Sequence, residues 1–534
     1  MHVGIVGAGI SGLSAALLLI REGHKVTIFE ASARLGGRIH THRFRPTSRN
    51  GSDVYFEAGA MRIPRSSLHD SVYALIQYLN NHNSSEMKVN LIPYVLEHKN
   101  NKAFIKGRKF DRLILTILLG EKSWIFLRNF DIGFQKLLKY DEYSFRRYLR
   151  AEGWPHEVIE YVELMNSQTN QYDLSFTELI MQNLDFNTKE WCTVRGGMSN
   201  LVEACASLIG RSNIHLNSPV QGISEKGNRK VELRISGPSE YSCTFDKVLL
   251  AIPTAAMYTI WQRPTWSFMK EQSLRGAWFE PLYKMGLHFR TRFWEHIPEP
   301  CFGGQSVTDL RFRWIVYPSD NLCHDGSGVL LLYCWMSDAL KWGAHSREDR
   351  VKLCLHDLAK YFADEEVDVH GQFIEAFDKL WSNEYCGGDA TFLPGQFSRF
   401  YEVAKKPEGN IHFAVESSGC NNRRSLSQQP HIEDWENIGD GGGIGDGLQV
   451  HADPGAGAGA GVNLHECCPP LHPPHPPPYR TSVNYAVEML RAISHIFAFL
   501  ASWTCTHMDM DMDISQNLGL GSARRITGIL IIRD

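Results

Sequence analysis

The chain has 534 residues, which is long enough for about three domains and a large buried core. Its 55 basic and 59 acidic residues give a net charge of −4, which excludes the strongly basic surface of a typical nucleic-acid-binding protein. We therefore expect no nucleic-acid partner.

The cysteines and the two ends of the chain bear on its location. The 12 cysteines show no C-x-x-C spacing, so we expect neither a zinc site nor a disulfide framework. The opening MHVGIVGAGISGL resembles a strand and a turn, not a secretory signal, and the final IRD is no peroxisomal tripeptide. The apolar segment 492–503 is too short to cross a membrane, which needs about 20 residues. We expect an intracellular, cytoplasmic protein.

The first thirty residues predict a nucleotide-binding unit. A short apolar strand, HVGIV, is followed by a helical apolar pattern and a second strand, KVTIFE. Gly7, Gly9 and Gly12 form G-x-G-x-x-G between the first strand and the helix, where glycine permits a tight turn and close approach of a pyrophosphate. Glu30 ends the second strand, where its carboxylate can accept hydrogen bonds from ribose hydroxyls. The alternative, an incidental glycine-rich turn, does not explain this order of elements.

A second glycine turn selects the type of cofactor. The stretch ARLGGRIHTH places Arg34, Gly36, Gly37 and Arg38 soon after Glu30. It resembles the second phosphate-contacting turn of the flavin amine oxidase family, which includes monoamine, polyamine and L-amino acid oxidases. Two arginines beside a glycine pair suit a diphosphate. A solvated basic loop, the alternative, accounts for the later arginines of this stretch but not for the glycine pair.

The resemblance implies an α/β fold with a discontinuous, Rossmann-like FAD-binding domain of the glutathione reductase type. Residues 193–205 resemble the family's glycine turn and helix, and 245–253 resemble the strand that returns under the flavin. The implied FAD-binding segments are 1–63, 186–265 and 390–416. Between them we expect a helical subdomain at 64–185 and an α+β substrate-binding domain at 266–389.

The resemblance also implies which residues contact FAD. They are Gly7, Gly9, Ser11, Gly12, Glu30, Ala31, Arg34, Gly37, Arg38, Gly59, Ala60, Met61, Arg62, Val220 and Glu416. Monoamine oxidases carry a cysteine directly after the glycine pair that here is Gly387 and Gly388, and that cysteine attaches the flavin covalently. This chain has Asp389 there, with Cys386 before the pair. We therefore expect noncovalent FAD, and the dispersed histidines give no reason to expect a metal.

The substrate side depends on the stretch YFEAGAMRIP, residues 55–64, which resembles the L-amino acid oxidase branch of the family. By this resemblance Arg62 pairs with the substrate α-carboxylate, a role that its bidentate guanidinium suits. The alternative is a structural arginine on a phosphate or a backbone carbonyl. Tyr333 is implied to give the carboxylate a second hydrogen bond, although by itself it reads as a core tyrosine.

Two further residues are assigned by the same resemblance. Lys284 lies in an alternating apolar strand, where a lysine is unfavourable without a partner. The family's lysine at this place holds a water against the flavin and assists the reaction with O2, which makes Lys284 a catalytic candidate. The alternative is a lysine whose ammonium reaches solvent. Trp381 is implied to pack near the active-site cavity, with an ordinary core role as the alternative.

The resemblance ends near Glu416. Val415 replaces an expected glycine, and the family's next helix is absent. The Gly- and Pro-rich residues 417–480 have too few apolar groups to fold, so we expect disorder, either in an insertion or in a sequence produced by a faulty gene model. For residues 481–534 we expect a C-terminal helix and a tail. Loss of this glycine and of this helix, which in the family close over the flavin, would weaken FAD binding.

Together these features favour an FAD-dependent enzyme that deaminates L-amino acids oxidatively to 2-oxo acids, releasing ammonia and hydrogen peroxide. Its partners would be an L-amino acid and O2, with no membrane, and a homodimer is one expected state because the family often dimerises. Two alternatives remain open within flavin enzymes: an amine or polyamine oxidase, and an amino-acid 2-monooxygenase. A third is a catalytically impaired relic.

Overall fold

The computed structural model describes residues 1–45, 54–111, 114–117, 130–185, 188–227, 229–237, 239–320, 322, 326–383, 387–414 and 529–532. All of them belong to one compact unit, formed by Met1–Pro430 and Ser522–Asp534. Cys386, Val415, Glu416 and the segment 417–480 lie outside the described residues, as does all of 481–534 except 529–532.

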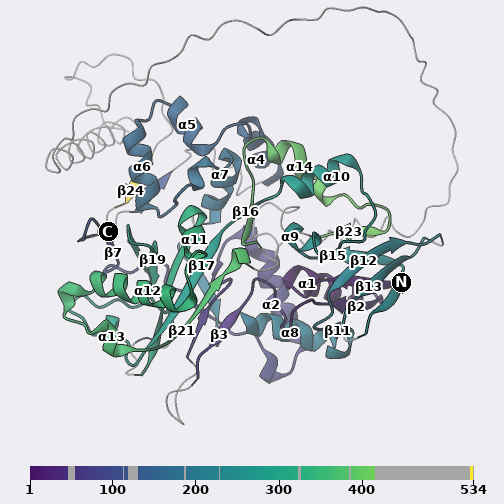
Figure 1. Cartoon of the computed structure of the whole chain (residues 1–534), viewed down its shortest axis with the longest axis horizontal. Coiled ribbons are helices and arrows are strands. Elements are labelled where there is room, and N and C mark those ends of the chain that lie inside the picture. Colours follow the sequence, from purple (N-terminus) through teal and green to yellow (C-terminus); the bar gives the residue numbers. More distant parts are fainter. Residues whose placement is uncertain are drawn as a thin grey trace, which may run out of the picture. The chain divides into compact units, whose positions relative to one another are not determined.

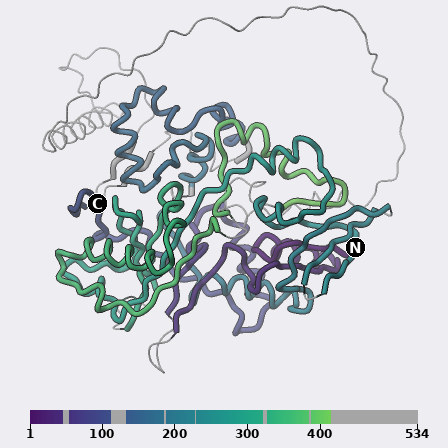
Figure 2. Tube along the Cα trace, in the orientation of Figure 1, coloured from purple at the N-terminus to yellow at the C-terminus, as the bar shows by residue number. Residues whose placement is uncertain are grey.

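A parallel sheet carries the first glycine turn. Its strands are β11 (Ile214–His215), β2 (Lys25–Phe29), β1 (His2–Val6), β15 (Lys247–Leu250) and β23 (Ile411–Phe413), in that spatial order. Neighbouring strands pair in parallel throughout. Figure 2 shows the early, purple strands running beside later, teal ones. Three distant parts of the sequence therefore build one sheet, as the predicted discontinuous Rossmann-like unit requires.

Two helices and a small antiparallel sheet cover the parallel sheet. Helix α1 (Ile10–Arg21) buries Leu13 and Leu17 and packs against α8 (Ser199–Ile209) (Figure 1). Strands β12 (Val220–Glu225), β13 (Val231–Ile235) and β14 (Tyr241–Phe245) form an antiparallel meander. The ring of Phe245, at its end, lies 5.9 Å from the ring of Phe29 in β2.

A seven-stranded sheet forms the second half of the unit. Its spatial order is β21 (Phe373–Leu380), β17 (Leu282–Phe289), β20 (Gly328–Trp335), β19 (Trp314–Val316), β18 (Gln305–Thr308), β7 (Lys102–Ile105) and β8 (Arg108–Asp111). All eight residues of β17 are buried, and its register places Lys284 opposite Tyr333 of β20. The sheet therefore fixes two predicted site residues side by side.

Helices cover both faces of this large sheet. On one face Trp314 and Leu331 share a hydrophobic cluster with α4 (Phe130–Leu137), α5 (Phe145–Ala151), α6 (His156–Met165) and α7 (Phe176–Asp185). On the other face Leu330 and Leu332 pack with α11 (Met336–Trp342), α12 (Arg347–Tyr361) and α13 (Val369–Gln372). Alternate residues of β20 thus serve two separate cores.

Residues 64–185, expected to be helical, also contain strands. Helix α2 (Asp70–His82) comes first, and β6 (Leu91–Pro93) and β9 (Ile114–Ile117) flank β7 and β8 in the sequence. Lys106 and Gly107 both have positive φ, 51° and 74°, which suits a two-residue hairpin turn between β7 and β8. Strand β24 (Ile529–Ile532) pairs with β9, so this part of the expected tail is a strand.

Small sheets and short α-helices make up the rest of the described elements, apart from single turns of 3-10 helix. They are β3 (Thr41–Arg43), β4 (Tyr55–Glu57), β5 (Ile63–Pro64), β10 (Trp191–Val194), β16 (Trp278–Glu280), β22 (Asp389–Thr391), α9 (Thr254–Met257), α10 (Phe268–Gly276) and α14 (Gln396–Lys405). Strand β3 pairs with β4, and β10 lies between β5 and β6. No helix within the described ranges is long and apolar enough to cross a membrane.

Candidate functional site

The first glycine turn forms a cradle at the start of α1. Gly7 has a φ of +104°, and a Cβ added there would lie 2.5 Å from the carbonyl oxygen of Ala251. A Cβ added at Gly12 would lie 2.1 Å from the Gly7 oxygen. A Cβ at Gly9 would meet nothing within 4 Å, so the space beside Gly9 is open. Open space at a helix N-terminus is where a pyrophosphate binds, and Ser11 belongs to the same first turn.

Glu30 is held beside this cradle. Its Oε2 accepts a hydrogen bond from the Ala8 N–H at 2.8 Å, and its Oε1 accepts from the N–H and the hydroxyl of Ser32 at 3.0 and 2.8 Å. A carboxylate has about four acceptor positions, so capacity remains for a ribose hydroxyl. The Ser218 N–H donates to the Glu30 carbonyl at 2.8 Å, which brings in the chain leading to buried Val220. Ala31 follows Glu30 and is exposed.

The second glycine turn docks on the first. The Gly36 N–H donates to the Ala8 carbonyl at 2.9 Å, and a Cβ at Gly37 would lie 3.5 Å from the Gly9 Cα. The Arg34 guanidinium donates to the carbonyls of Leu35 and Ile39 at 3.2 and 3.3 Å, so it also braces its own turn. The structure therefore brings both predicted phosphate turns together.

The segment from Glu57 to Arg62 continues this arrangement. The Ala60 N–H donates to the Arg38 carbonyl at 3.0 Å. Only glycine fits at position 59, because a Cβ there would lie 1.9 Å from the Arg38 oxygen. The Arg38 side chain itself donates to the Gly388 carbonyl at 3.0 Å. The predicted residues Gly59, Ala60 and Met61 thus lie next to the second glycine turn.

Lys284 points from the large sheet toward this segment. Its Nζ donates to the Gly59 carbonyl at 2.5 Å and to the Glu57 carbonyl at 3.4 Å, and it lies 4.7 Å from the centre of the Tyr333 ring. Burial, followed by the charge of Arg62, lowers the pKa of Lys284 to about 7, against the opposing effect of Glu57. An ammonium with this pKa can change its charge near neutral pH.

Glu57 is a buried carboxyl that the sequence analysis missed. Its Oε1 accepts from the Met198 N–H at 2.7 Å, just before α8, and its Oε2 accepts from the Thr41 hydroxyl at 2.9 Å. Burial raises the pKa of Glu57 to about 7, although both hydrogen bonds and the charge of Lys284 act in the opposite direction. The signal in the sequence that could have identified Glu57 is an acidic residue at the end of a short apolar strand.

Arg62 is half-buried among aromatic rings. Its guanidinium carbon lies 5.3 Å from the ring centre of Trp191 and 5.6 Å from those of Tyr94 and Trp314. One of its nitrogens also approaches the Tyr94 hydroxyl at 3.5 Å and the Gln305 side-chain oxygen at 3.4 Å. Sequence reasoning found none of these neighbours, which come from four separate parts of the chain.

Tyr333 joins Arg62 and Lys284 in one cluster. Its ring lies 5.8 Å from that of Trp314 and 4.8 Å from that of Trp335. The side chain is half-buried. The guanidinium of Arg62, the phenol of Tyr333 and the ammonium of Lys284 therefore lie near the segment that follows the glycine turns. The guanidinium and the phenol can bind a carboxylate.

Trp381 also contacts that segment. Its indole N–H donates to the Ala58 carbonyl at 2.8 Å, and the Arg34 guanidinium carbon is 6.0 Å from its ring centre. Only 2% of its surface is exposed. These contacts place Trp381 beside the second glycine turn, so a contact with substrate remains a prediction.

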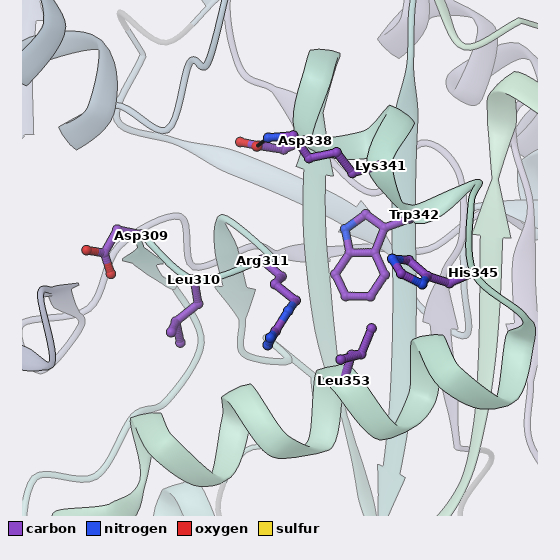
Figure 3. A pocket seen from close by; sticks show the side chains of 8 residues that line it. All are labelled: Asp309, Leu310, Arg311, Asp338, Lys341, Trp342, His345 and Leu353. Carbon is purple, nitrogen blue, oxygen red and sulfur yellow. Dashed lines mark hydrogen bonds and ion pairs between the residues drawn. The ribbon is translucent and has the colours of Figure 1, made fainter.

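A separate cavity of about 500 Å³ contains none of the predicted site residues (Figure 3). Trp342 in its wall belongs to the core on the opposite face of the large sheet from Trp314. Among its charged lining residues, Lys341 pairs with Asp338 at 3.0 Å, and Arg311 pairs with Asp357, which lies outside the lining. We do not assign the substrate to this cavity. Within the described ranges, no three His, Cys, Asp or Glu side chains group as a metal site.

Residues 10–421, which make up most of the chain, match the family of flavin containing amine oxidoreductases. The chain belongs to this family. It is therefore a flavin-dependent oxidoreductase, and the predicted family and α/β fold class are confirmed. The cofactor is FAD, and the residues present fit it, with open space at Gly9 beside the helix N-terminus and the Glu30 carboxylate close by.

Individual relatives are similar over about the same part of the chain. An L-amino-acid oxidase of Siganus canaliculatus is 31% identical over 452 residues, which cover 78% of this chain and 80% of the relative. A protein of Dictyostelium discoideum named as a bifunctional amine oxidase is 29% identical over 480 residues, or 78% of this chain. The chain spans only 44% of that relative's length.

Among solved structures, a putrescine oxidase bound to putrescine superposes with a TM-score of 0.64. The match covers 82% of this chain and 100% of that one, at 18% sequence identity. At this identity the likeness supports the fold and does not identify the substrate.

Proposed function

We propose that the protein oxidises L-amino acids with FAD and O2. The observation that carries the proposal is that Arg62 and Tyr333 both contact Trp314, and that Tyr333 also contacts Lys284. A substrate amino acid, water and O2 would give a 2-oxo acid, ammonia and hydrogen peroxide, with the intermediate imino acid hydrolysed by the water. Bound FAD supplies the chemistry of accepting a hydride and passing two electrons to O2.

In this proposal the chain's own residues position the substrate and shape the charge around it. Arg62 and Tyr333 bind the α-carboxylate, which fixes the Cα hydrogen and selects the L-enantiomer. Lys284 supplies a positive charge where negative charge develops during the reaction with O2. Trp381 contributes to the wall of the site.

The relatives support this choice, because the L-amino-acid oxidase of Siganus canaliculatus aligns over most of its own length. We further propose the FAD-binding segments 1–63, 186–265 and 390–416, the subdomain 64–185 and the substrate-binding domain 266–389. Asp389 follows the glycine pair where a covalent cysteine would stand, which supports noncovalent FAD.

An amine oxidase is the second candidate, because the matched family is that of flavin containing amine oxidoreductases. It predicts oxidation of amines that have no carboxylate and indifference to replacement of Arg62. An amino-acid 2-monooxygenase would instead release an amide and carbon dioxide.

The test begins with the absorbance spectrum of the purified full-length protein, recorded before and after anaerobic addition of L-amino acids. We expect flavin bands that bleach with L-amino acids but not with D-amino acids, and that bleach far more slowly with simple amines. Arg62→Ala should lower kcat/KM for the amino acid about 100-fold or more, because a charge-assisted bidentate pair is lost. Bleaching by amines alone would overturn the proposal, and so would a folded protein that stays colourless after incubation with FAD.

A further inference from the structure

Three aromatic side chains pack around the Arg62 guanidinium, and each comes from a different part of the sequence. Tyr94 follows β6, Trp191 begins β10 and Trp314 begins β19 of the large sheet. Their ring centres lie 5.3 to 5.6 Å from the guanidinium carbon. We call Tyr94, Trp191 and Trp314 the aromatic collar.

The collar can restrain Arg62 without neutralising it. A ring face attracts a cation through its quadrupole and carries no net charge. A long arginine side chain otherwise loses considerable rotamer freedom when it binds a ligand, and neighbours that already restrict it reduce that loss. Rings around the guanidinium therefore favour an arginine that is oriented in advance, and they do not themselves neutralise its charge.

Trp314 has a second contact, with Tyr333. Its ring meets the Tyr333 ring at 5.8 Å with an interplanar angle of 78°, an edge-to-face arrangement. The backbones of the two residues are also paired across β19 and β20. Trp314 thus lies in contact with both proposed carboxylate-binding residues.

We propose that the aromatic collar positions Arg62 for a carboxylate, and that Trp314 sets the distance between the Arg62 and Tyr333 side chains. The collar residues are positioning residues that determine selectivity for amines carrying an α-carboxylate. The inference rests on the proposed function and extends it to three residues outside the motif that contains Arg62.

The experiment compares Trp314→Leu with Trp314→Phe in the FAD-loaded enzyme. Trp342→Leu is the matched control, because it removes the same side-chain volume from the core on the other face of the sheet. Tyr94→Leu is a second collar variant for the case in which Trp314→Leu does not fold. Two readouts are used: the Kd of benzoate by calorimetry, and kcat and KM for L-phenylalanine and for 2-phenylethylamine, which lacks the carboxylate.

We expect Trp314→Leu to raise the benzoate Kd and the KM for L-phenylalanine about tenfold, the effect of losing a partly buried cation–π contact. The kcat should change less than KM, and kinetics with the amine should not change. Trp314→Phe should recover much of the loss because it keeps a ring, and Trp342→Leu should leave the benzoate Kd as in the wild type.

Other outcomes distinguish a failure of this inference from a failure of the proposed function. If Trp314→Leu and Tyr94→Leu bind benzoate like the wild type while Arg62→Ala does not, the collar has no positioning role. An equal loss with the amino acid and the amine would also overturn the inference, since it indicates general damage. If the wild type binds benzoate through Arg62 and the collar but oxidises no L-amino acid, the proposed function fails and the positioning role stands.

Discussion

The Nζ of Lys284 lies 2.5 Å from the carbonyl oxygen of Gly59. Gly59 can occupy this place only because it lacks a Cβ, which would lie 1.9 Å from the Arg38 oxygen. Through this one hydrogen bond the buried strand β17 reaches the backbone that packs on the second glycine turn. The side chain of the proposed oxygen-reactive lysine is therefore placed relative to the cofactor cradle by its bond to a main-chain carbonyl.

Replacing Lys284 by methionine should lower kcat/KM for O2 about 100-fold, because a preorganised positive charge is removed from the site. The pKa of Lys284, lowered to about 7 by burial, also predicts that in the wild type this rate constant falls as pH rises through 7, because the ammonium is lost. Oxygen-dependent kinetics from pH 6 to 9 provide the test. Lys379→Met, which removes the next lysine across the sheet, is the control. A methionine variant with an unchanged O2 rate constant would remove Lys284 from the mechanism.

Gly9 and Gly12 should respond differently to alanine. Gly9 has φ −72° and nothing within 4 Å of an added Cβ, so Gly9→Ala should leave the melting temperature of the apoprotein unchanged. The new methyl occupies the cradle and should weaken FAD binding about tenfold or more. At Gly12 the methyl would meet the Gly7 oxygen at 2.1 Å, so Gly12→Ala should lower the melting temperature itself. FAD titration and thermal melts of both apoproteins check this pair, and equal FAD affinity in Gly9→Ala and wild type would contradict it.

These contrasts also show which parts of the site were predictable. Gly7, Gly9, Gly12 and Glu30 lie within one short strand–helix–strand stretch, and local spacing is sufficient to recognise them. Lys284 was identifiable because a lysine in an apolar strand needs a partner. Its actual partner is a backbone carbonyl, which has no sequence signature.

The surroundings of Arg62 were not predictable by the same reasoning. Tyr94, Trp191 and Trp314 are far apart in the sequence and read singly as core aromatics, and only the assembled sheets bring them around one guanidinium. The hairpin of β7 and β8 was missed for a different reason. Residues 64–185 were expected to be helical, so the turn at Lys106 and Gly107 was not recognised as a hairpin signal.

Glu57 predicts a specific pH dependence of stability. Burial raises its folded-state pKa from 4.5 to about 7, so the folded protein binds the proton more tightly than the unfolded chain does. The stabilisation from this proton is complete below pH 4.5 and is lost as pH rises through 7, with a total on the order of 3 kcal/mol. The wild type should therefore lose more thermal stability than Glu57→Gln between pH 5 and 8. Melts at each pH are the measurement, with exposed Glu240→Gln as the control. Parallel curves for the wild type and Glu57→Gln would rule out this titration.

Noncovalent attachment of FAD can be tested directly. Gly387 and Gly388 precede Asp389, which has no thiol to bond the flavin, so acid precipitation of the holoenzyme should leave all flavin in the supernatant. The absorbance of pellet and supernatant is compared. Yellow colour that stays with the washed pellet would contradict the expectation and direct attention to the remaining cysteines.

Arg62→Lys distinguishes recognition by charge from recognition by shape. Lysine keeps the positive charge but has no planar fork, and its compact, strongly hydrated ammonium does not bind a carboxylate in a bidentate manner. It also stacks less favourably within the aromatic collar of Tyr94, Trp191 and Trp314. We therefore expect KM for the L-amino acid to rise about tenfold or more while the enzyme still prefers the amino acid to its amine. Arg62→Ala should lose that preference as well. Steady-state kinetics with both substrates make the comparison, and an Arg62→Lys enzyme with wild-type KM would mean that charge alone is sufficient at this position.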